Sequence, residues 1–282
     1  MLVTGACFVA VTALVKWLGT GLPAAQTAFL RYILGLVFLI PMWSTLRSVT
    51  LSRQQWGLFA LRGVFHSGGV ILWFFAMARI SIAEVTALNY MTPVYVTIGA
   101  ALFLGERLAF RRIAAVVVAM LGALIILRPG FRELEPGHWA MVLAAVLFCG
   151  SYLSAKVLSG QVHAAVVVAM LSIFVTIGLA PFAFAQWVTP SWSDLAILFC
   201  VACFATLGHY TMTLAFAAAP VAVTQPVTFL QLVWAVLLGA LVFAEPADAW
   251  VMLGGAVIMA AVSFIAWREA VIKRQSSMPS VG

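Results

Sequence analysis

Charged residues are scarce in this sequence. Asp, Glu, Lys and Arg together make up 8% of the chain, whereas hydrophobic residues make up 65%. A soluble domain carries about a quarter of its residues as charged side chains, so this chain has too little charge to cover a surface in water. Apolar runs of about 20 residues are typical of helices that cross a lipid bilayer. The sequence therefore predicts an all-α polytopic membrane protein.

Groups that carry out catalysis or bind metals are also few. Cys200 and Cys203 form a CxxC pair inside an apolar run, without the companion ligands that complete a four-ligand zinc site. The sequence has no Gly-x-x-x-x-Gly-Lys-Ser/Thr loop for nucleotide phosphates, and no acidic residue in the middle of an apolar run that would carry a proton. We therefore expect no cofactor, no metal and no enzymatic activity. An intramembrane enzyme, the alternative, would have only His66 and His209 as bases.

The net charge of +7 arises from basic residues that flank the apolar runs. They do not form the basic stripe interleaved with aromatic residues that nucleic-acid binding requires, so no nucleic-acid partner is expected. Cytoplasmic flanks of membrane helices carry an excess of Lys and Arg. With both termini in the cytoplasm, the inner side has Arg47, Arg53, Arg62, Arg107, Arg111, Arg112, Lys156, Arg268, Lys273 and Arg274, and the outer side has Lys16, Arg31, Arg79, Arg128 and Arg132. This excess predicts a multi-pass protein of the cell inner membrane with both termini cytoplasmic.

Ten apolar spans can be placed along the chain, with boundaries at turn signals or charges. The first span has no charged segment before it and no clear small-residue cleavage site after it, so we interpret it as a retained helix rather than a signal peptide. The spans are expected at about 2–19, 24–43, 56–78, 84–104, 110–128, 137–158, 163–186, 194–216, 221–243 and 248–267.

The second half of the chain repeats the first. Offsets of 140 residues (156 − 16) and 139 residues (245 − 106) align Lys16 with Lys156, Phe8 with Phe148, Pro41 with Pro181, Gly69 with Gly208, and Glu106 with Glu245. Each half has five spans, an odd number, so the second half would enter the membrane from the opposite side. We expect two inverted five-helix repeats, at 1–130 and 137–268, and a cytoplasmic tail at 269–282.

Three segments resemble a known family. They are Phe-Ala-Met-Ala-Arg-Ile-Ser-Ile-Ala-Glu-Val-Thr-Ala-Leu-Asn-Tyr-Met-Thr-Pro-Val-Tyr-Val at 75–96, Leu-Gly-Glu-Arg-Leu at 104–108, and Ala-Phe-Ala-Ala-Ala-Pro-Val-Ala-Val-Thr-Gln-Pro at 215–226, in a block that ends in Glu245. Here the chain resembles the EamA-type branch of the drug/metabolite transporter superfamily. The resemblance implies ten helices, cytoplasmic termini and a central cavity lined by both halves. It implies no particular substrate, since the family moves amino acids, vitamins, nucleoside-like compounds and drugs in either direction.

Polar residues within the spans are the candidates for substrate binding, because burying them in lipid is costly. They form one stripe in the fourth span, within about 100° of arc, and a narrower stripe in the ninth. Each stripe would line a cavity or, alternatively, form hydrogen bonds to a packed neighbouring helix. Asn89 and Thr228 are repeat equivalents (228 − 89 = 139), and Pro93 would free a backbone carbonyl and kink its helix. The stripes contain Thr86, Asn89, Tyr90, Pro93 and Thr97, and Thr224, Thr228 and Gln231.

Two histidines lie deep within spans. His66 shares a helix face with Gly69 and Trp73, and His209 stands beside Tyr210. Each imidazole would stack on or hydrogen-bond a flat polar substrate, or carry a proton. The alternative is a neutral histidine bonded to a neighbouring helix. The two histidines do not align in the repeat (209 − 139 = 70), so we expect any shared role to be asymmetric.

Charged residues near the ends of spans are expected to anchor the helices at the membrane surface. Lys16 lies a few residues from the end of the first span, where long basic side chains usually reach the headgroups. Binding of an anionic group is the alternative. Arg31 and Glu84 lie near the outer ends of their spans and could pair, but interfacial anchoring is the favoured interpretation.

Together these features predict a secondary transporter that moves a small organic metabolite across the inner membrane. A polar lining with little fixed charge suits a neutral or zwitterionic metabolite, and we favour uptake of a vitamin such as riboflavin. Export of amino acids or related metabolites is the alternative, and a non-transporting enzyme or regulatory subunit the second one. The expected partners are the substrate and the lipid bilayer, with homodimer formation left open. The predicted substrate-binding residues are His66, Trp73, Thr86, Asn89, Tyr90, Pro93, His209, Tyr210, Thr228 and Gln231.

Overall fold

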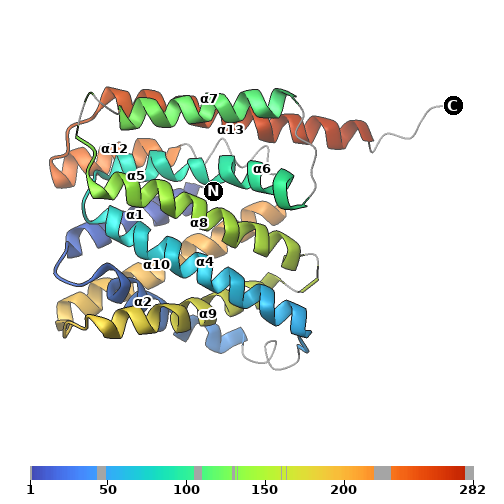
Figure 1. The fold of residues 1–282 in the computed structure, drawn as a ribbon. Helices are drawn as coiled ribbons and strands as arrows, with labels where there is room; N and C mark the ends of the chain where they lie inside the picture. The colour runs from blue at the N-terminus through green and yellow to red at the C-terminus, as the bar shows by residue number, and fades with distance from the viewer. Residues whose placement is uncertain are drawn as a thin grey trace.

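Every regular element that the computed structural model describes is a helix (Figure 1). The structure describes residues 2–42, 49–104, 110–128, 131, 133–159, 161–162, 164–218 and 230–276. Over these ranges the backbone forms no β-strand. The predicted all-α class is therefore confirmed.

The first half of the chain has a helical segment at each predicted span. The second segment ends in a 3₁₀ helix, η1, and the fourth is divided at Tyr90 into two helices. The elements are α1 (Leu2–Leu18), α2 (Ala24–Gly35), η1 (Leu36–Met42), α4 (Arg53–Met77), α5 (Ile82–Asn89), α6 (Met91–Leu104) and α7 (Phe110–Leu127).

The second half follows the same plan. α12 covers only part of the ninth predicted span, because residues 219–229 lie outside the described ranges. The last helix continues to Ser276, so part of the predicted tail is helical. The elements are α8 (Pro136–Ser159), α9 (Ala164–Ala185), α10 (Trp192–Ala218), α12 (Leu230–Phe243) and α13 (Ala249–Ser276).

Five helical segments are long and apolar enough to cross a membrane. They are Arg53–Met77, Ile82–Phe103, Pro136–Ala155, Val166–Ala185 and Trp192–Thr211. Five further apolar helices in the described part of the chain are shorter, with 10–17 residues. The chain therefore has the build of a multi-pass membrane protein, and the count of ten spans stays a prediction.

The two halves of the chain pack against each other throughout the bundle (Figure 1). α4 packs on α8 and α1 packs on α10; α4 packs on α9 and α2 on α10; α6 packs on α8 and α1 on α12. When each helix is replaced by its equivalent in the other half, the first contact of each pair in this list becomes the second contact of that pair. α7 and α13, the last helices of the two halves, lie side by side along one edge of the bundle. The contacts thus have the symmetry of a two-repeat protein.

α7 and α13 are antiparallel and cross at very short distance. Arg128, at the end of α7, forms an ion pair with Asp248, which precedes α13. A Cβ atom on Gly122 would lie 2.8 Å from the carbonyl oxygen of Gly254, and one on Gly254 would lie 2.5 Å from the carbonyl oxygen of Gly122. Small residues allow membrane helices to approach in this way. The contact therefore depends on both glycines.

Two helices begin at capping boxes. Ser81 Oγ accepts a hydrogen bond from the Glu84 backbone N–H at 3.1 Å, and Glu84 Oε2 accepts one from the Ser81 N–H at 3.0 Å. Ser52 and Gln55 form the same arrangement at the start of α4. These bonds satisfy backbone donors that the first helical turn leaves free. The starts of α4 and α5 are therefore fixed by local sequence.

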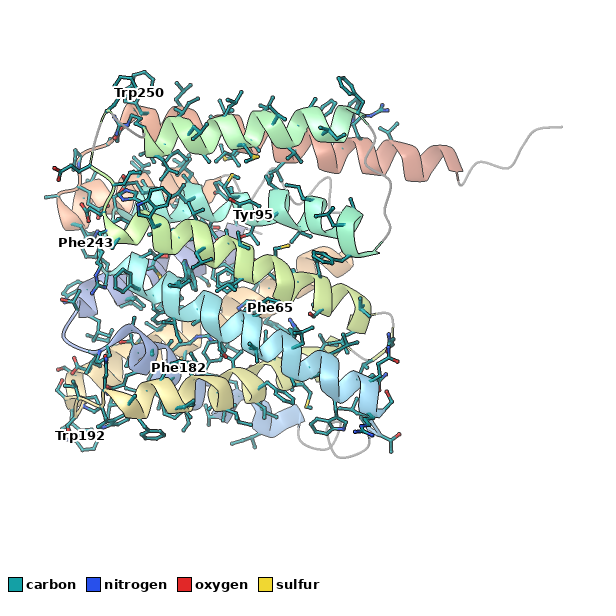
Figure 2. The ribbon with its side chains drawn as sticks, viewed as in Figure 1. Phe65, Tyr95, Phe182, Trp192, Phe243 and Trp250 are labelled. Atoms are coloured by element: carbon teal, nitrogen blue, oxygen red, sulfur yellow. The ribbon has the colours of Figure 1, made fainter. Side chains whose placement is uncertain are left out.

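Large apolar side chains cover the outside of the bundle (Figure 2). Phe182 is 59% exposed, in a position where a soluble protein would place polar groups. Trp192 and Trp250, at the starts of α10 and α13, lie at the same end of the bundle. Tryptophans gather where membrane helices reach the headgroups. The surface is therefore suited to lipid.

Candidate functional site

His66 lies at the centre of α4 with both ring nitrogens in hydrogen bonds. Nε2 is 3.0 Å from the Tyr32 hydroxyl of α2, and Nδ1 is 3.1 Å from the Ser151 hydroxyl of α8. The side chain is 7% exposed. Its imidazole therefore joins a helix of the first half to a helix of the second, and its ring is held in one orientation.

Aromatic rings enclose the same histidine. The Phe148 ring centroid is 5.1 Å from that of His66. Trp73 meets Phe148 nearly at a right angle, with centroids 6.2 Å apart. The indole Nε1 of Trp73 is buried and makes no hydrogen bond in the described structure. His66 and Trp73, predicted to share a helix face, are thus gathered around one phenylalanine.

His209 occupies a matching position on α10. Its ring lies 5.1 Å from that of Phe8 on α1, edge to face. Phe8 and Phe148 are repeat equivalents by sequence (148 − 8 = 140). The two histidines, which do not align, therefore contact equivalent phenylalanines from opposite halves. The two histidines are not repeat equivalents, but the phenylalanines that they contact are.

The glycines of the repeat complete this arrangement. A Cβ atom on Gly69 would come within 2.9 Å of the Phe148 ring, and one on Gly208 would come within 3.5 Å of the Phe8 ring. Both pairs of equivalents, glycine and phenylalanine, therefore meet across the two halves. Each phenylalanine lies over a glycine and beside a histidine.

Positive charge surrounds the histidines. Arg62, Arg31 and His209 all interact electrostatically with His66, and the two arginines also act on His209. Arg62 is only 7% exposed, and its Nη1 donates a 2.9 Å hydrogen bond to the Val167 carbonyl oxygen of α9. Its Nε has no partner in the described structure. The charge pattern places Arg62 among the flanking charges of the inner side, whereas the structure buries its side chain inside the bundle.

The second polar group lies where α5 gives way to α6. The helix breaks at Tyr90, and Pro93 falls in the first turn of α6. The Thr86 hydroxyl donates to the Ile82 carbonyl oxygen of its own helix at 2.8 Å, and Asn89 Oδ1 accepts from Thr92 at 3.5 Å. The Tyr90 hydroxyl makes a hydrogen bond to the backbone of α12 at Leu232. The break therefore joins the fourth span to α12.

Three predicted site residues belong to helices of the second half. Gln231, at the start of α12, packs against α1, since a Cβ atom on Gly5 would lie 3.5 Å from its Cβ. Tyr210 is 61% exposed and shares none of the ring contacts of His209. Thr228 lies outside the described residues, as do Thr224 and the side chains of Pro93 and Thr97.

Lys16 is not an isolated anchor at the membrane surface. Its ammonium group forms an ion pair with Glu245 and donates a hydrogen bond to the Ile80 carbonyl oxygen at 2.8 Å. Glu245 Oε2 in turn accepts the Ile82 backbone N–H at 3.1 Å. One carboxylate thus connects α1, the start of α5 and the segment between α12 and α13. The expected snorkelling of Lys16 is replaced by a bond between the two halves.

The suggested pairing of Arg31 with Glu84 does not form. Glu84 lies 3.2 Å from Nε2 of His138, in the first turn of α8. The Arg31 guanidinium lies over the ring of Tyr32, 4.0 Å from its centroid. Arg31 therefore belongs to the surroundings of His66, and Glu84 to another contact between the halves.

The described residues do not form a metal centre, since no group of three or more His, Cys, Asp or Glu side chains among them could hold an ion. A pocket opens elsewhere, near the end of α1, bounded by Val15, Gly19, Phe74 and Arg79. It contains none of the predicted substrate-binding residues. The described pocket is thus separate from the polar groups around His66 and His209.

The profile of the EamA-like transporter family matches residues 1–128 and 135–267. The chain belongs to the EamA-like transporter family. A solved protein structure has the same fold, with a TM-score of 0.64 and 19% sequence identity over 95% of this chain and 96% of the other. Family membership confirms the two-repeat architecture and the prediction of a transporter rather than an enzyme.

Relatives within the family differ in what they carry. The riboflavin transporter of Rhizobium johnstonii is 31% identical over 276 residues, which cover 95% of this chain and 90% of the relative. The pseudopaline exporter CntI of Pseudomonas aeruginosa is 30% identical over 257 residues, 90% of each chain. The S-adenosylmethionine uptake transporter of Rickettsia felis is 26% identical over 261 residues, 90% of this chain and 86% of the relative. The chain is thus similar both to a transporter named for uptake and to one named for export.

Proposed function

We propose that this EamA-like protein is a secondary transporter of the cell inner membrane that works by alternating access. Its ten spans form two inverted five-helix repeats, residues 1–130 and 137–268, followed by a tail at 269–282, and both termini are cytoplasmic. The observation that carries the proposal is the double contact in which Gly69 meets Phe148 and Gly208 meets Phe8. Inverted repeats that meet around one polar centre can rock about it and expose it to each side in turn.

The substrate binds, on this proposal, between the third, fourth, eighth and ninth spans. His66, Trp73 and His209 provide rings and hydrogen-bonding groups from one side. Asn89, Tyr90 and Gln231 provide amides and a hydroxyl from the break between α5 and α6 and from the start of α12. Broken helices at the repeat interface are a common location for transporter binding sites, which supports this assignment.

The ion pair of Lys16 with Glu245 closes one end of this pathway. It joins the first repeat to the second beside the starts of α5 and α13. In the proposed orientation this is the outer end, so the described conformation is closed to the outside. Opening requires the pair to separate, and alternating access predicts that it separates once in each transport cycle.

The first substrate to test is riboflavin, taken up by the cell. The relative named as a riboflavin transporter supports it, as do the aromatic rings around His66 and the amide and hydroxyl groups of the proposed site. Expression in a riboflavin-auxotrophic bacterium should restore growth at low external riboflavin, and His66→Ala should abolish the rescue. If the membrane-inserted protein neither rescues growth nor takes up labelled riboflavin, this substrate is rejected.

Export of an amino acid or related metabolite is the second candidate. The relative named as a pseudopaline exporter favours it. Membrane vesicles and a panel of labelled metabolites distinguish the two by direction, since an exporter accumulates label in inside-out vesicles and an importer accumulates it in right-side-out vesicles. If no solute crosses with or without a proton gradient, the transport proposal itself fails and a regulatory subunit becomes the better interpretation.

A further inference from the structure

Arg62 is a buried charge that forms no ion pair with a carboxylate among the described residues. The side chain is 7% exposed and lies in α4, one helical turn before His66. A charged side chain inside a membrane protein normally faces the bundle interior and pairs with another group, because an unpaired charge at low dielectric is costly. A group that balances the charge of Arg62 is therefore expected to be part of the protein's function.

Four acidic residues of the described structure are engaged elsewhere. Glu245 pairs with Lys16 and Asp248 with Arg128. Glu84 lies against His138, and Asp194 caps its own helix at Ser191. The titratable groups that act on Arg62 among the described residues are the phenols of Tyr32 and Tyr152, which are neutral at neutral pH. Within the described part of the chain, therefore, no carboxylate forms an ion pair with Arg62.

The guanidinium also has unused hydrogen-bonding capacity. An arginine has five N–H donors in a planar fork that matches carboxylate and phosphate oxygens. Nη1 donates to the Val167 carbonyl oxygen, whereas Nε is buried without a partner. An arginine that only tied α4 to α9 would need the first bond and would gain nothing from the buried, empty second donor. The orphaned Nε points to a ligand.

A second arginine, Arg31, adds positive charge beside the two histidines. Arg31 interacts electrostatically with both His66 and His209, as Arg62 does. Two arginines therefore flank the proposed binding centre, and the described structure provides no acidic side chain between them. An anion at this centre would be attracted by both.

We propose that Arg62, supported by Arg31, forms a subsite for an anionic group of the transported metabolite, a carboxylate or a phosphate. The inference rests on the proposed function and names the substrate class more narrowly. The substrate brings the counter-charge into the bundle, while His66 and the surrounding rings hold its remaining part. A zwitterionic or acidic metabolite then binds better than its neutral analogue.

The test compares pairs of compounds in which one member has the anionic group and the other lacks it. Full-length protein purified in detergent is titrated with riboflavin 5′-phosphate and riboflavin, and with L-methionine and L-methioninamide, and binding is measured by the shift in thermal unfolding. We expect the anionic member of at least one pair to bind about tenfold or more tightly. The same pairs are then used as competitors of uptake in proteoliposomes.

Variants identify the group responsible. Arg62→Gln should remove the preference for the anion while leaving the affinity for the neutral member nearly unchanged, and Arg62→Lys should keep part of the preference. Arg53→Gln is the matched control, because Arg53 begins the same helix and is exposed. If Arg62→Gln does not fold, Arg31→Gln, with its partly exposed side chain, provides the second test and should weaken the preference.

Two results would overturn the subsite. One is equal binding of both members in every pair, and the other is an anion preference that survives Arg62→Gln and Arg31→Gln. Either result can occur in a protein that transports a neutral solute, so the proposed function would stand. Absence of any transport would instead reject the proposed function; an anion preference in binding that Arg62→Gln removes would then show an anion-binding site, but not one for a transported metabolite.

Discussion

His66 is bonded to both halves of the protein by a single ring. Its contacts with Tyr32 and Ser151 answer one question that the sequence left open, because they are the bonds of a histidine tied to neighbouring helices. They also fix the orientation of the ring that lies beside Phe148, at an interplanar angle of 54°. A histidine held in this way keeps one ring orientation within the bundle.

Loss of the Ser151 hydroxyl should therefore affect the whole centre. Ser151→Ala leaves a buried ring nitrogen without a partner, which typically costs about 1–3 kcal/mol. We expect a lower thermal midpoint of the purified protein and slower uptake of its substrate.

The matched control for that change is Ser172→Ala. The Ser172 hydroxyl donates only to the Val168 carbonyl oxygen of its own helix and lies at the exposed face. Equal thermal midpoints for the two variants would show that the bond to His66 contributes nothing to stability.

The sequence singles out part of the hydrogen-bonded cluster around His66 and leaves the rest unrecognised. His66 and Trp73 were predicted because polar or large aromatic residues deep in a span are unusual. Arg62 is counted in the sequence only among the basic residues of the inner side, and Ser151 is not singled out by any pattern. Burial and partners are set by the packing of other helices, and no local pattern in the sequence encodes them.

At the scale of helices, the fourth span shows how a local signal and a distant contact act together. Pro93 has no N–H for a bond back to the preceding turn, and the helix breaks at Tyr90. The Tyr90 hydroxyl then bonds the backbone at Leu232 in the other half. A kink near Pro93 could be predicted from sequence, whereas the contact that the break makes could not.

Covalent linkage of Lys16 to Glu245 should stop transport if this pair opens during the cycle. In a background without native cysteines, a Lys16→Cys and Glu245→Cys protein is treated with a short bifunctional methanethiosulfonate reagent. We expect uptake in proteoliposomes to fall to background and to recover after reduction, because α1 and the segment after α12 can no longer separate.

The Arg128→Cys and Asp248→Cys protein is the control for this linkage. That pair joins α7 and α13, which stay packed along one edge of the bundle, so the reagent should leave its transport intact. If the protein cross-linked at positions 16 and 245 still transports, the proposed opening at the Lys16–Glu245 pair is contradicted.

The crossing of α7 and α13 should tolerate no side chain at its closest point. Gly254→Val would place atoms within 2.5 Å of the Gly122 carbonyl oxygen, and such overpacking costs about 1–3 kcal/mol. A lower yield of monodisperse protein and a lower thermal midpoint are expected. Gly57→Val, where a Cβ atom meets nothing within 4 Å, should have the thermal midpoint of the unmodified protein. If Gly57→Val lowered the midpoint more than Gly254→Val, the helix crossing would not determine stability.

At the scale of the whole molecule, the repeat was the most predictable property. Offsets of 139 and 140 aligned glycines and phenylalanines that the structure brings together across the halves. Helix positions also followed from apolar length and turn signals. The match between His66 and His209 was not predictable, because equivalent surroundings can hold residues that are displaced by a turn in the alignment.

Orientation in the membrane can be tested with two single cysteines. Thr20 lies exposed between α1 and α2, and Gln54 lies exposed in the first turn of α4. After Cys7, Cys149, Cys200 and Cys203 are replaced, a membrane-impermeant maleimide should label Thr20→Cys in intact cells and Gln54→Cys only in permeabilised cells. Labelling in the opposite pattern would invert the proposed topology.

The paired Gly–Phe contacts have a consequence for how such a protein could arise. Phe8 packs on Gly208 and Phe148 on Gly69, so each half supplies the ring that fills the space in the other. Neither half contains a complete interior. A chain with one repeat alone would have to associate with an antiparallel copy of itself, and in that pair the same contact would form twice by symmetry. Fusion of the two copies would then free each histidine to change independently of the other.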